Sequence, residues 1–250
     1  MRKQRLITIG LLLLLAASFA LNVALVLGLR RAYGEQLLHQ IWPAGGAMPR
    51  ASTNETGATI LLLGDSRVAD WPESHWPAMR VVNAGVPGQT SAELLRHCPS
   101  TLDQVRPKIV VIQIGINDLK AIGVYPELQR AIGSTCVSNI IAVIEECRRR
   151  DARVLVTAVW PAGSVGGVRR LIWNDGVAEA IAETNRALEQ SLPNRPGVRW
   201  ADPYSAIASR PPAAGMASLY RDTLHFKPEF YARMSPLLQR MLESWIPPAP

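Results

Sequence analysis

The sequence predicts an α/β fold, in which helices cover both faces of a parallel sheet and one membrane-spanning helix precedes the sheet. Short aliphatic or β-branched runs typical of strands occur at residues 59–63, 80–83, 109–114, 153–159 and 198–201. Helical patterns lie between and after them, at about 91–105, 134–150, 175–192 and 227–245. Strands that alternate with helices in this way form parallel sheets, because each crossover helix returns the chain to the same end of the sheet.

The chain begins with an apolar segment, Leu6 to Leu29, that is longer than the roughly 20 residues needed to span a bilayer. A cleaved secretory signal has an apolar core of only about 7 to 15 residues before its small-residue cleavage site. Ala16 and Ala20 imitate such a site, but both lie inside the apolar segment. We therefore expect an uncleaved, single-pass anchor in the inner membrane rather than a signal peptide.

Basic side chains on both flanks of this segment bear on its orientation. Three precede it, together with the amino terminus, and two follow it: Arg2, Lys3, Arg5, Arg30 and Arg31. Because cytoplasmic flanks carry the excess of Lys and Arg, we expect the rest of the chain on the extracytoplasmic, periplasmic side. The anchor also accounts for most of the formal net charge of +7. The remainder is nearly balanced, so nucleic acid is not an expected partner.

We divide the chain into three parts: an anchor over 1–31, a membrane-proximal segment and linker over 32–58, and a globular domain over 59–246. The membrane-proximal segment starts as the end of a helix. Its later half is rich in Gly, Ala, Ser, Thr and Pro, a composition that favours a loop over regular structure.

The three cysteines, Cys98, Cys136 and Cys147, show neither CxxC pairing nor the spacing of metal ligands. We therefore predict no metal site. We interpret each cysteine as a small buried hydrophobic side chain, with one disulfide as the alternative.

The first predicted strand ends abruptly on a small polar triplet. In "TILLLGDSRVADW", residues 59–71, the aliphatic run gives way to Gly64, Asp65 and Ser66. In an open parallel sheet, ligands bind beyond the carboxyl ends of the strands, so this triplet lies where a site is expected. A simple polar turn is the alternative, since Gly, Asp and Ser are common turn residues.

The next two predicted strands also end on small or polar residues. "VVNAGVPGQT" supplies Gly85 and "VVIQIGINDL" supplies Asn117, at the same edge of the sheet as Ser66. This set suits acyl transfer, in which an activated serine attacks and fixed donors stabilise the developing oxyanion. The candidate donors are the Gly85 N–H, which no side chain obstructs, the Asn117 amide and the Ser66 N–H. Taken singly, such residues are more often structural, with Gly85 as a turn glycine and Asn117 as a turn cap.

A base for Ser66 occurs near the C-terminus, in "YRDTLHFKPEF". Asp222 and His225 are three residues apart, just before a helical pattern that begins near Lys227. A local turn of that span brings the carboxylate to the imidazole, which fixes the ring tautomer and stabilises the imidazolium ion. A helix cap beside a surface histidine is the alternative.

Four blocks in this order, "GDSR", "NAGVPG", "GIND" and "DTLHF", resemble the SGNH hydrolase family, also called the GDSL esterases and lipases. The resemblance covers about residues 58–245. It implies a three-layer, flavodoxin-like α/β/α sandwich around a five-stranded parallel sheet. It also implies hydrolysis of esters without a metal or an organic cofactor.

The resemblance assigns roles to the residues singled out above. It implies that Ser66 is the nucleophile, His225 the base and Asp222 its orienting acid, with the Ser66 N–H, Gly85 and Asn117 forming the oxyanion hole. The expected substrate is a carboxylic ester on a lipid or an acylated glycan of the cell envelope.

One residue departs from the family's usual pattern, because many members have Leu after the nucleophile and this chain has Arg67. In the cleft, Arg67 would favour an acidic or polar substrate. We prefer a position on the helix surface. The segment 162–175, rich in Gly and Arg, follows the fourth strand and is expected to be a substrate-contacting loop or simply a solvent-exposed one.

Two other functions fit the same residues. An acyltransferase would use the same acyl-enzyme but would pass the acyl group to a hydroxyl of an envelope glycan instead of to water. A non-catalytic, membrane-tethered binding module is the third interpretation. The complete set of Ser66, Asp222 and His225 argues against it.

Overall fold

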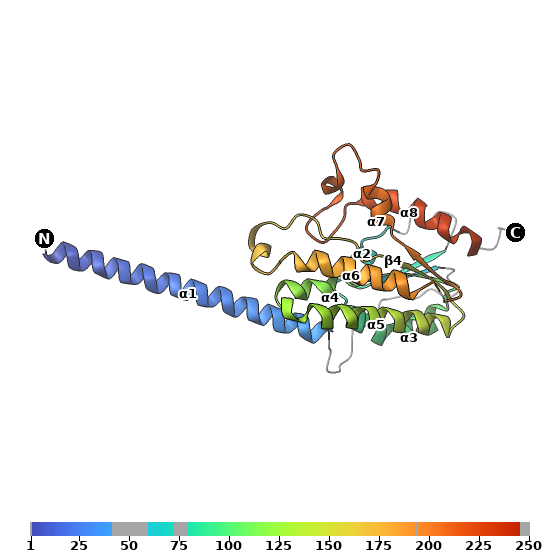
Figure 1. Cartoon of the computed structure of the whole chain (residues 1–250), viewed down its shortest axis with the longest axis horizontal. Coiled ribbons are helices and arrows are strands. Elements are labelled where there is room, and N and C mark those ends of the chain that lie inside the picture. Colours follow the sequence, from blue (N-terminus) through green and yellow to red (C-terminus); the bar gives the residue numbers. More distant parts are fainter. Residues whose placement is uncertain (1, 42–59, 73–79, 194, 246–250) are drawn as a thin grey trace.

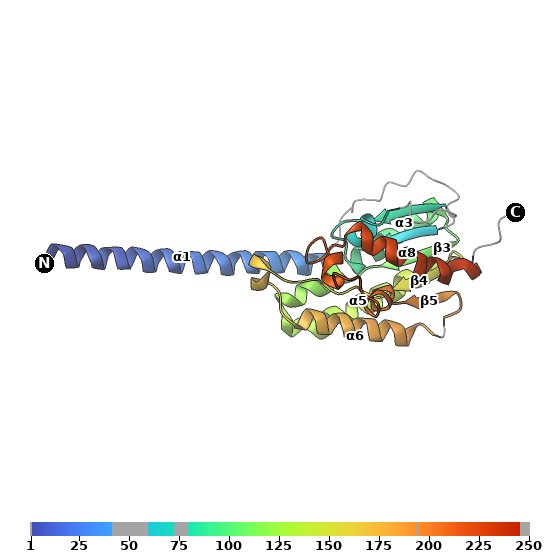
Figure 2. The same ribbon diagram turned by 90° about the horizontal axis from the view of Figure 1, so that it is seen from above.

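The computed structural model describes residues 2–41, 60–72, 80–193 and 195–245, and it shows a long N-terminal helix that projects from an α/β domain (Figures 1 and 2). The strands are β1 (Ile60–Gly64), β2 (Val81–Gly85), β3 (Ile109–Gln113), β4 (Arg153–Thr157) and β5 (Val198–Ala201). All neighbours are parallel, in the order β2-β1-β3-β4-β5. The predicted five-stranded parallel sheet is confirmed.

The register of the sheet aligns the carboxyl ends of its first three strands. Gly64, the last residue of β1, pairs with Gly85 of β2 on one side and with Gln113 of β3 on the other. The residues that follow these strands therefore lie along one edge of the sheet, which we call the carboxyl rim.

The helices that cover the sheet lie close to their predicted positions. The longer ones are α3 (Ser91–Val105), α5 (Gln129–Arg148), α6 (Gly176–Ser191) and α8 (Pro228–Leu242). The short ones are α2 (Ser66–Ala69), α4 (Ile116–Leu119), α7 (Pro203–Ala208), η2 (Lys120–Gly123), η3 (Pro126–Leu128), η4 (Gly167–Leu171), η5 (Met216–Leu219) and η6 (Glu243–Trp245). The α5 helix begins earlier than predicted, because the turn η3 leads directly into it.

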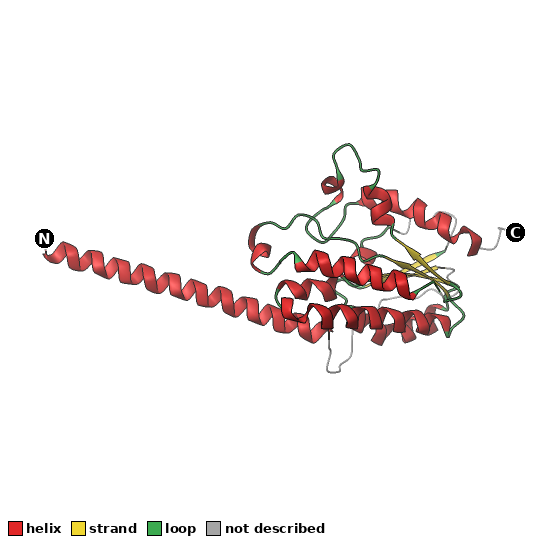
Figure 3. Ribbon diagram, viewed as in Figure 1, coloured by secondary structure: helices red, strands yellow, loops and turns green. Residues whose placement is uncertain are grey.

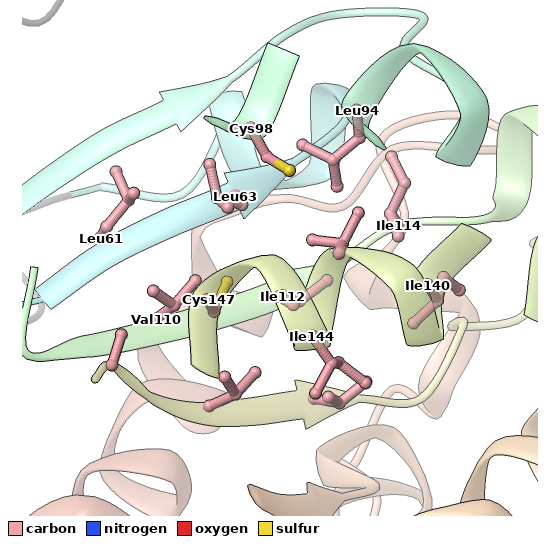
Figure 4. Packing of buried hydrophobic residues seen from close by; sticks show 14 of the residues in the cluster. Leu61, Leu63, Leu94, Cys98, Val110, Ile112, Ile114, Ile140, Ile144 and Cys147 are labelled. Carbon is pink, nitrogen blue, oxygen red and sulfur yellow. The ribbon is translucent and has the colours of Figure 1, made fainter. Parts of the chain in front are cut away.

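Alternate residues of the strands pack into opposite layers. Leu61 and Leu63 of β1 lie in a core shared with α3, α5 and α6, whereas Ile60 and Leu62 face α8 and its aromatic side chains. Figure 4 shows Leu63 beside Cys98 in the first of these layers, with Leu61 further along β1. Burial on both faces explains why β1 is a continuous aliphatic run.

The interpretation of the cysteines as buried hydrophobic side chains is confirmed. Cys98, Cys136 and Cys147 are all free and fully buried. All three belong to the core formed with α3 and α5, so the alternative of a disulfide is wrong.

The N-terminal helix α1 (Arg2–Ile41) is apolar and long enough to cross a membrane, a property that an N-terminal signal sequence shares. It continues well past the apolar segment, and its last turns pack on the domain, where Gly34, Leu37 and Ile41 are buried. The rest of the predicted linker, residues 42–58, lies outside the described residues.

Candidate active site

Ser66 lies at the carboxyl rim as the first residue of α2, directly after β1. The preceding Asp65 is in an extended conformation and caps this helix, because its Oδ1 accepts a hydrogen bond of 2.8 Å from the Arg67 N–H. The N–H groups of a first helical turn have no partner within the helix. Ser66 therefore presents both its hydroxyl and its backbone N–H at the rim.

The structure brings the histidine of the C-terminal segment to this serine. His225 Nε2 lies 2.9 Å from Ser66 Oγ, and Nδ1 of the same ring lies 2.8 Å from Asp222 Oδ2. An ionised carboxylate can only accept, so Nδ1 carries the proton and Nε2 accepts from the Ser66 hydroxyl. This arrangement joins residues 159 positions apart in the sequence.

A tight turn fixes the carboxylate beside the imidazole. Asp222 Oδ1 accepts from the backbone N–H of Leu224 at 2.7 Å and of His225 at 3.0 Å. Partial burial raises the pKa of Asp222. These two hydrogen bonds and the one from the imidazole outweigh that effect, so the pKa is lowered to about 2. The carboxylate is therefore ionised at neutral pH and can stabilise an imidazolium ion.

Asn117 lies in α4, at the end of β3, with its amide oriented by two hydrogen bonds. Its Nδ2 donates to the Gln89 carbonyl oxygen at 3.0 Å, and its Oδ1 accepts from Lys120 Nζ at 2.7 Å. Within the described part of the chain, the second N–H of Nδ2 has no acceptor. Asn117 thus retains one donor for a ligand.

Gly85 does not offer the donor that the sequence predicts. Its N–H already donates to Asn83 Oδ1 at 2.9 Å. A Cβ atom at this position would lie 2.3 Å from the Ala69 nitrogen, so the glycine is needed for close packing of β2 against α2. The expectation for Gly85 is therefore wrong, because its N–H is used inside the fold.

The second glycine of "NAGVPG" fits the role better, although sequence reasoning did not select it. Gly88 has a φ of 79° in the turn between β2 and α3, and its N–H has no acceptor among the described residues. It directly precedes Gln89, whose carbonyl oxygen accepts from Asn117. Gly88 thus lies one residue before the backbone group that orients the Asn117 amide, and its N–H is a candidate donor.

Two buried carboxyl groups lie behind the rim. Asp118 accepts from the Ser91 N–H at 2.9 Å and from the Ser91 hydroxyl at 2.6 Å, which ties α4 to the start of α3. Asp65 Oδ2 has no hydrogen-bond partner among the described residues. Burial raises the pKa of Asp65 and of Asp118 to about 6. Neither of the two carboxyl groups is exposed to solvent.

Arg67 lies neither in the cleft nor on the helix surface, so both positions considered for it are wrong. It is fully buried, with its guanidinium 5.2 Å from the Phe226 ring centroid. Nε donates to the Leu224 carbonyl oxygen at 2.8 Å, Nη2 to that of Pro161 at 2.9 Å and Nη1 to that of Trp160. Three carbonyl groups converge behind the Ser66 turn, and the several N–H groups of one guanidinium donate to all three.

The segment between β4 and α6 forms a long loop interrupted by η4 (Figure 3). With the segment 216–223 it lines a cavity of about 720 Å³, whose wall includes Arg169, Tyr204, Tyr220 and Asp222. The loop of residues 162–175 thus adjoins the carboxylate that faces His225. Its contact with a substrate stays a prediction.

Comparisons with known proteins agree on one family. Residues 53–233 match the model of the GDSL-like Lipase/Acylhydrolase family. The chain is 28% identical to Esterase TesA of Pseudomonas aeruginosa in an alignment 202 positions long that covers 68% of this chain and 92% of that protein. It is 38% identical to Thioesterase 1/protease 1/lysophospholipase L1 of Escherichia coli in an alignment 72 positions long that covers 24% of this chain and 35% of that protein.

Solved structures share the fold. A GDSL-like lipase from Bacteroides thetaiotaomicron superposes with a TM-score of 0.62 at 18% identity, over 85% of this chain and 98% of that one. The aryl esterase of M. smegmatis superposes with a TM-score of 0.58 at 16% identity, over 75% of this chain and 99% of that one. At these identities the structural likeness establishes the fold alone.

Proposed function

This chain belongs to the GDSL-like lipase/acylhydrolase family of ester hydrolases, and we propose that it cleaves carboxylic esters through Ser66, His225 and Asp222. The observation that carries the proposal is the continuous chain of contacts from Ser66 Oγ through both ring nitrogens of His225 to Asp222 Oδ2, at 2.9 and 2.8 Å. Serine is a weak nucleophile at neutral pH and needs such a base.

In the acylation step, His225 Nε2 takes the hydroxyl proton while Ser66 Oγ bonds to the carbonyl carbon of the ester. The carbonyl oxygen becomes an oxyanion, which the N–H groups of Ser66, Gly88 and Asn117 stabilise because each lacks another acceptor. When the tetrahedral intermediate collapses, the C–O bond to the alcohol breaks and the alcohol leaves with the proton from His225.

In the deacylation step, His225 Nε2 takes a proton from water, and the hydroxide formed adds to the acyl carbon. The same three N–H groups stabilise the second oxyanion. The bond between Ser66 Oγ and the acyl carbon then breaks, Ser66 recovers its proton from His225 and the carboxylic acid leaves. Throughout the cycle, ionised Asp222 stabilises the imidazolium ion and holds its tautomer.

We also propose that residues 1–31 anchor this enzyme in the inner membrane with the catalytic domain outside it, and that 32–58 connect the anchor to the domain of 59–246. The length and apolar composition of α1 support anchoring, and the larger number of basic residues before the apolar segment supports this orientation.

The proposal is tested by measuring the steady-state hydrolysis of p-nitrophenyl acetate and butyrate by the full chain in detergent. We expect Asp222→Asn to lower kcat by roughly 10²–10⁴-fold with a small change in KM, because an amide cannot stabilise the imidazolium ion. The exposed Asp151→Asn, after the C-terminal end of α5, is the matched control and should behave as the parent. Full activity of Asp222→Asn would contradict the assigned role of this carboxylate.

A further inference from the structure

The exposed large apolar side chains of the described residues all lie on α1, between Leu6 and Leu29. An α-helix rises 1.5 Å per residue, so this segment is roughly 36 Å long, enough for a hydrocarbon core of about 30 Å. The catalytic domain shows no comparable surface among its described residues. The length and exposure of this apolar segment suit a bilayer, in keeping with the anchor proposed above.

The other end of the same helix is docked on the domain without a break. Gly34 packs so closely that a Cβ atom there would lie 2.6 Å from the ring of Tyr125. Leu37 and Ile41 are buried in a core with residues of α4 and η2. Thr90 Oγ1 donates to the Gln40 carbonyl oxygen at 2.8 Å. The helix is thus a fixed part of the domain rather than a flexible tether.

The elements on which α1 docks are those that carry the proposed oxyanion hole. Ile116, in the docking core, directly precedes Asn117. Thr90, which bonds to α1, follows Gly88 by two residues and caps α3. The base of α1 therefore lies at the carboxyl rim and not at the opposite edge of the sheet.

The rest of α1 extends away from the domain on the rim side. In Figures 1 and 2 the C-terminus lies on the side of the domain away from α1, and the η4 loop is the part of the domain that reaches furthest toward the N-terminus of the helix. That loop carries Arg169, which lines the cavity beside Asp222, and the exposed Arg170. Basic groups on this side suit the anionic surface of a membrane.

We propose that α1 is a rigid strut that holds the carboxyl rim toward the bilayer, so that the substrate is an acyl ester carried by a lipid of the same membrane. This rests on the proposed function of Ser66 and of the anchor. From Leu29 to the docked Leu37 the helix rises roughly 12 Å, whereas the polar layer of one leaflet is about 5–8 Å thick. The rim thus lies just above the headgroups, within reach of a single-chain lipid that rises from the leaflet.

The test changes the height of the rim and nothing else. A helix-forming insertion of eleven residues after Arg31 adds about 16 Å and about three whole turns, so it lifts the domain with little rotation. The same eleven residues placed before Arg2 are the matched control, because they leave the height unchanged. The full chain and both variants are placed in vesicles of phosphatidylethanolamine and phosphatidylglycerol that contain a 1-acyl lysophospholipid.

We expect the insertion after Arg31 to lower fatty-acid release from the vesicles by about 10-fold or more, because the effective concentration of ester at the rim falls. Turnover of p-nitrophenyl butyrate should equal that of the parent, as should turnover of the same lysophospholipid in detergent micelles. A seven-residue insertion, roughly 10 Å, should give an intermediate loss.

Two results would overturn the strut. The first is equal release of fatty acid from vesicles by the parent and by the insertion variants. The second is a parent that cleaves p-nitrophenyl butyrate but no lipid ester in vesicles. That result is expected of an enzyme that acts on soluble or glycan-borne esters. A parent that cleaves neither ester would instead overturn the proposed function, and the strut with it.

Discussion

Arg67 Nε donates to the carbonyl oxygen of Leu224 at 2.8 Å, so the residue after the proposed nucleophile holds the residue before the proposed base. The same guanidinium also bonds to Trp160 and Pro161, which begin the loop after β4. Burial lowers the pKa of Arg67, yet a guanidinium stays charged at any pH at which proteins fold. One buried cation thus connects the three segments that surround Ser66.

Replacing Arg67 by Leu should destabilise the protein and reduce its activity. The carbonyl groups of Trp160 and Leu224 would lose this donor, whereas that of Pro161 keeps the hydroxyl of Tyr220. Each such loss costs about 1–3 kcal/mol, so we expect the free energy of unfolding to fall by roughly 2 kcal/mol or more. Arg67→Lys keeps the charge but has only one donor group, so its stability and activity should lie between those of Arg67→Leu and those of the parent. Thermal unfolding and ester turnover measure both effects, with the exposed Arg210→Leu as control. Parent-like stability of Arg67→Leu would contradict this role.

Removing a donor of the oxyanion hole should slow the chemical step more than it weakens substrate binding. We expect Asn117→Ala to lower kcat by roughly 10²–10³-fold with little change in KM, as for other oxyanion donors. Gly88→Ala should also reduce kcat, because a side chain is strained at a φ of 79° and displaces the N–H.

The variant Gly85→Ala distinguishes the role of Gly85 from that of Gly88, the other glycine of "NAGVPG". Since a Cβ atom would lie 2.3 Å from the Ala69 nitrogen, this variant should fail to reach the parent's stability. A Gly88→Ala variant with parental kcat would exclude its N–H from the oxyanion hole.

The buried carboxyl groups predict how stability depends on pH. The pKa of Asp65 and of Asp118 is about 6, above the value near 3.9 of an unfolded chain, so the folded protein binds these protons more tightly. Their contribution to the free energy of unfolding is therefore present below about pH 4 and is lost as the pH rises through about 6.

We expect the parent to lose on the order of 2 kcal/mol per carboxyl group across this window, measured by urea unfolding at each pH. Asp65→Asn cannot ionise and should flatten the dependence, whereas the exposed Asp175→Asn should keep it. An Asp65→Asn variant with the slope of the parent would show that Asp65 does not titrate in this range.

The cysteines should be unreactive in the folded protein. Burial raises the pKa of the Cys98 thiol to about 12, and it raises those of Cys136 and Cys147 as well. Because only the thiolate reacts, a disulfide reagent should modify none of them in native protein and all 3 after unfolding, since the chain has no others. Fewer than 3 reactive thiols in unfolded, unreduced protein would indicate a disulfide.

The sequence was sufficient for features that depend on local pattern. The sheet followed from five aliphatic runs, and Ser66, Asp222 and His225 stood out because each block pairs a chemical group with a strand end or a helix start. The two glycines of "NAGVPG" could not be told apart, because the difference lies in the Asn83 side chain that occupies the Gly85 N–H.

Features that depend on distant segments could not be read in advance. The position of Arg67 is set by carbonyl groups of residues 160, 161 and 224. No local sequence pattern indicates that these carbonyl groups lie close together. The docking of α1 left a weak signal, since Gly34, Leu37 and Ile41 follow helical spacing after the apolar segment ends. A pattern of three residues does not indicate which surface of the domain the helix contacts.

The most direct test of the central claim is labelling of the full chain by a fluorophosphonate, with the modified residue located by peptide mass spectrometry. The reagent bonds only to a serine that a base has activated, so we predict a single adduct on Ser66. Ser66→Ala should abolish it, and His225→Ala should as well, because the hydroxyl would lose the base 2.9 Å away. An adduct on another residue, or a folded parent that takes no label, would contradict the account.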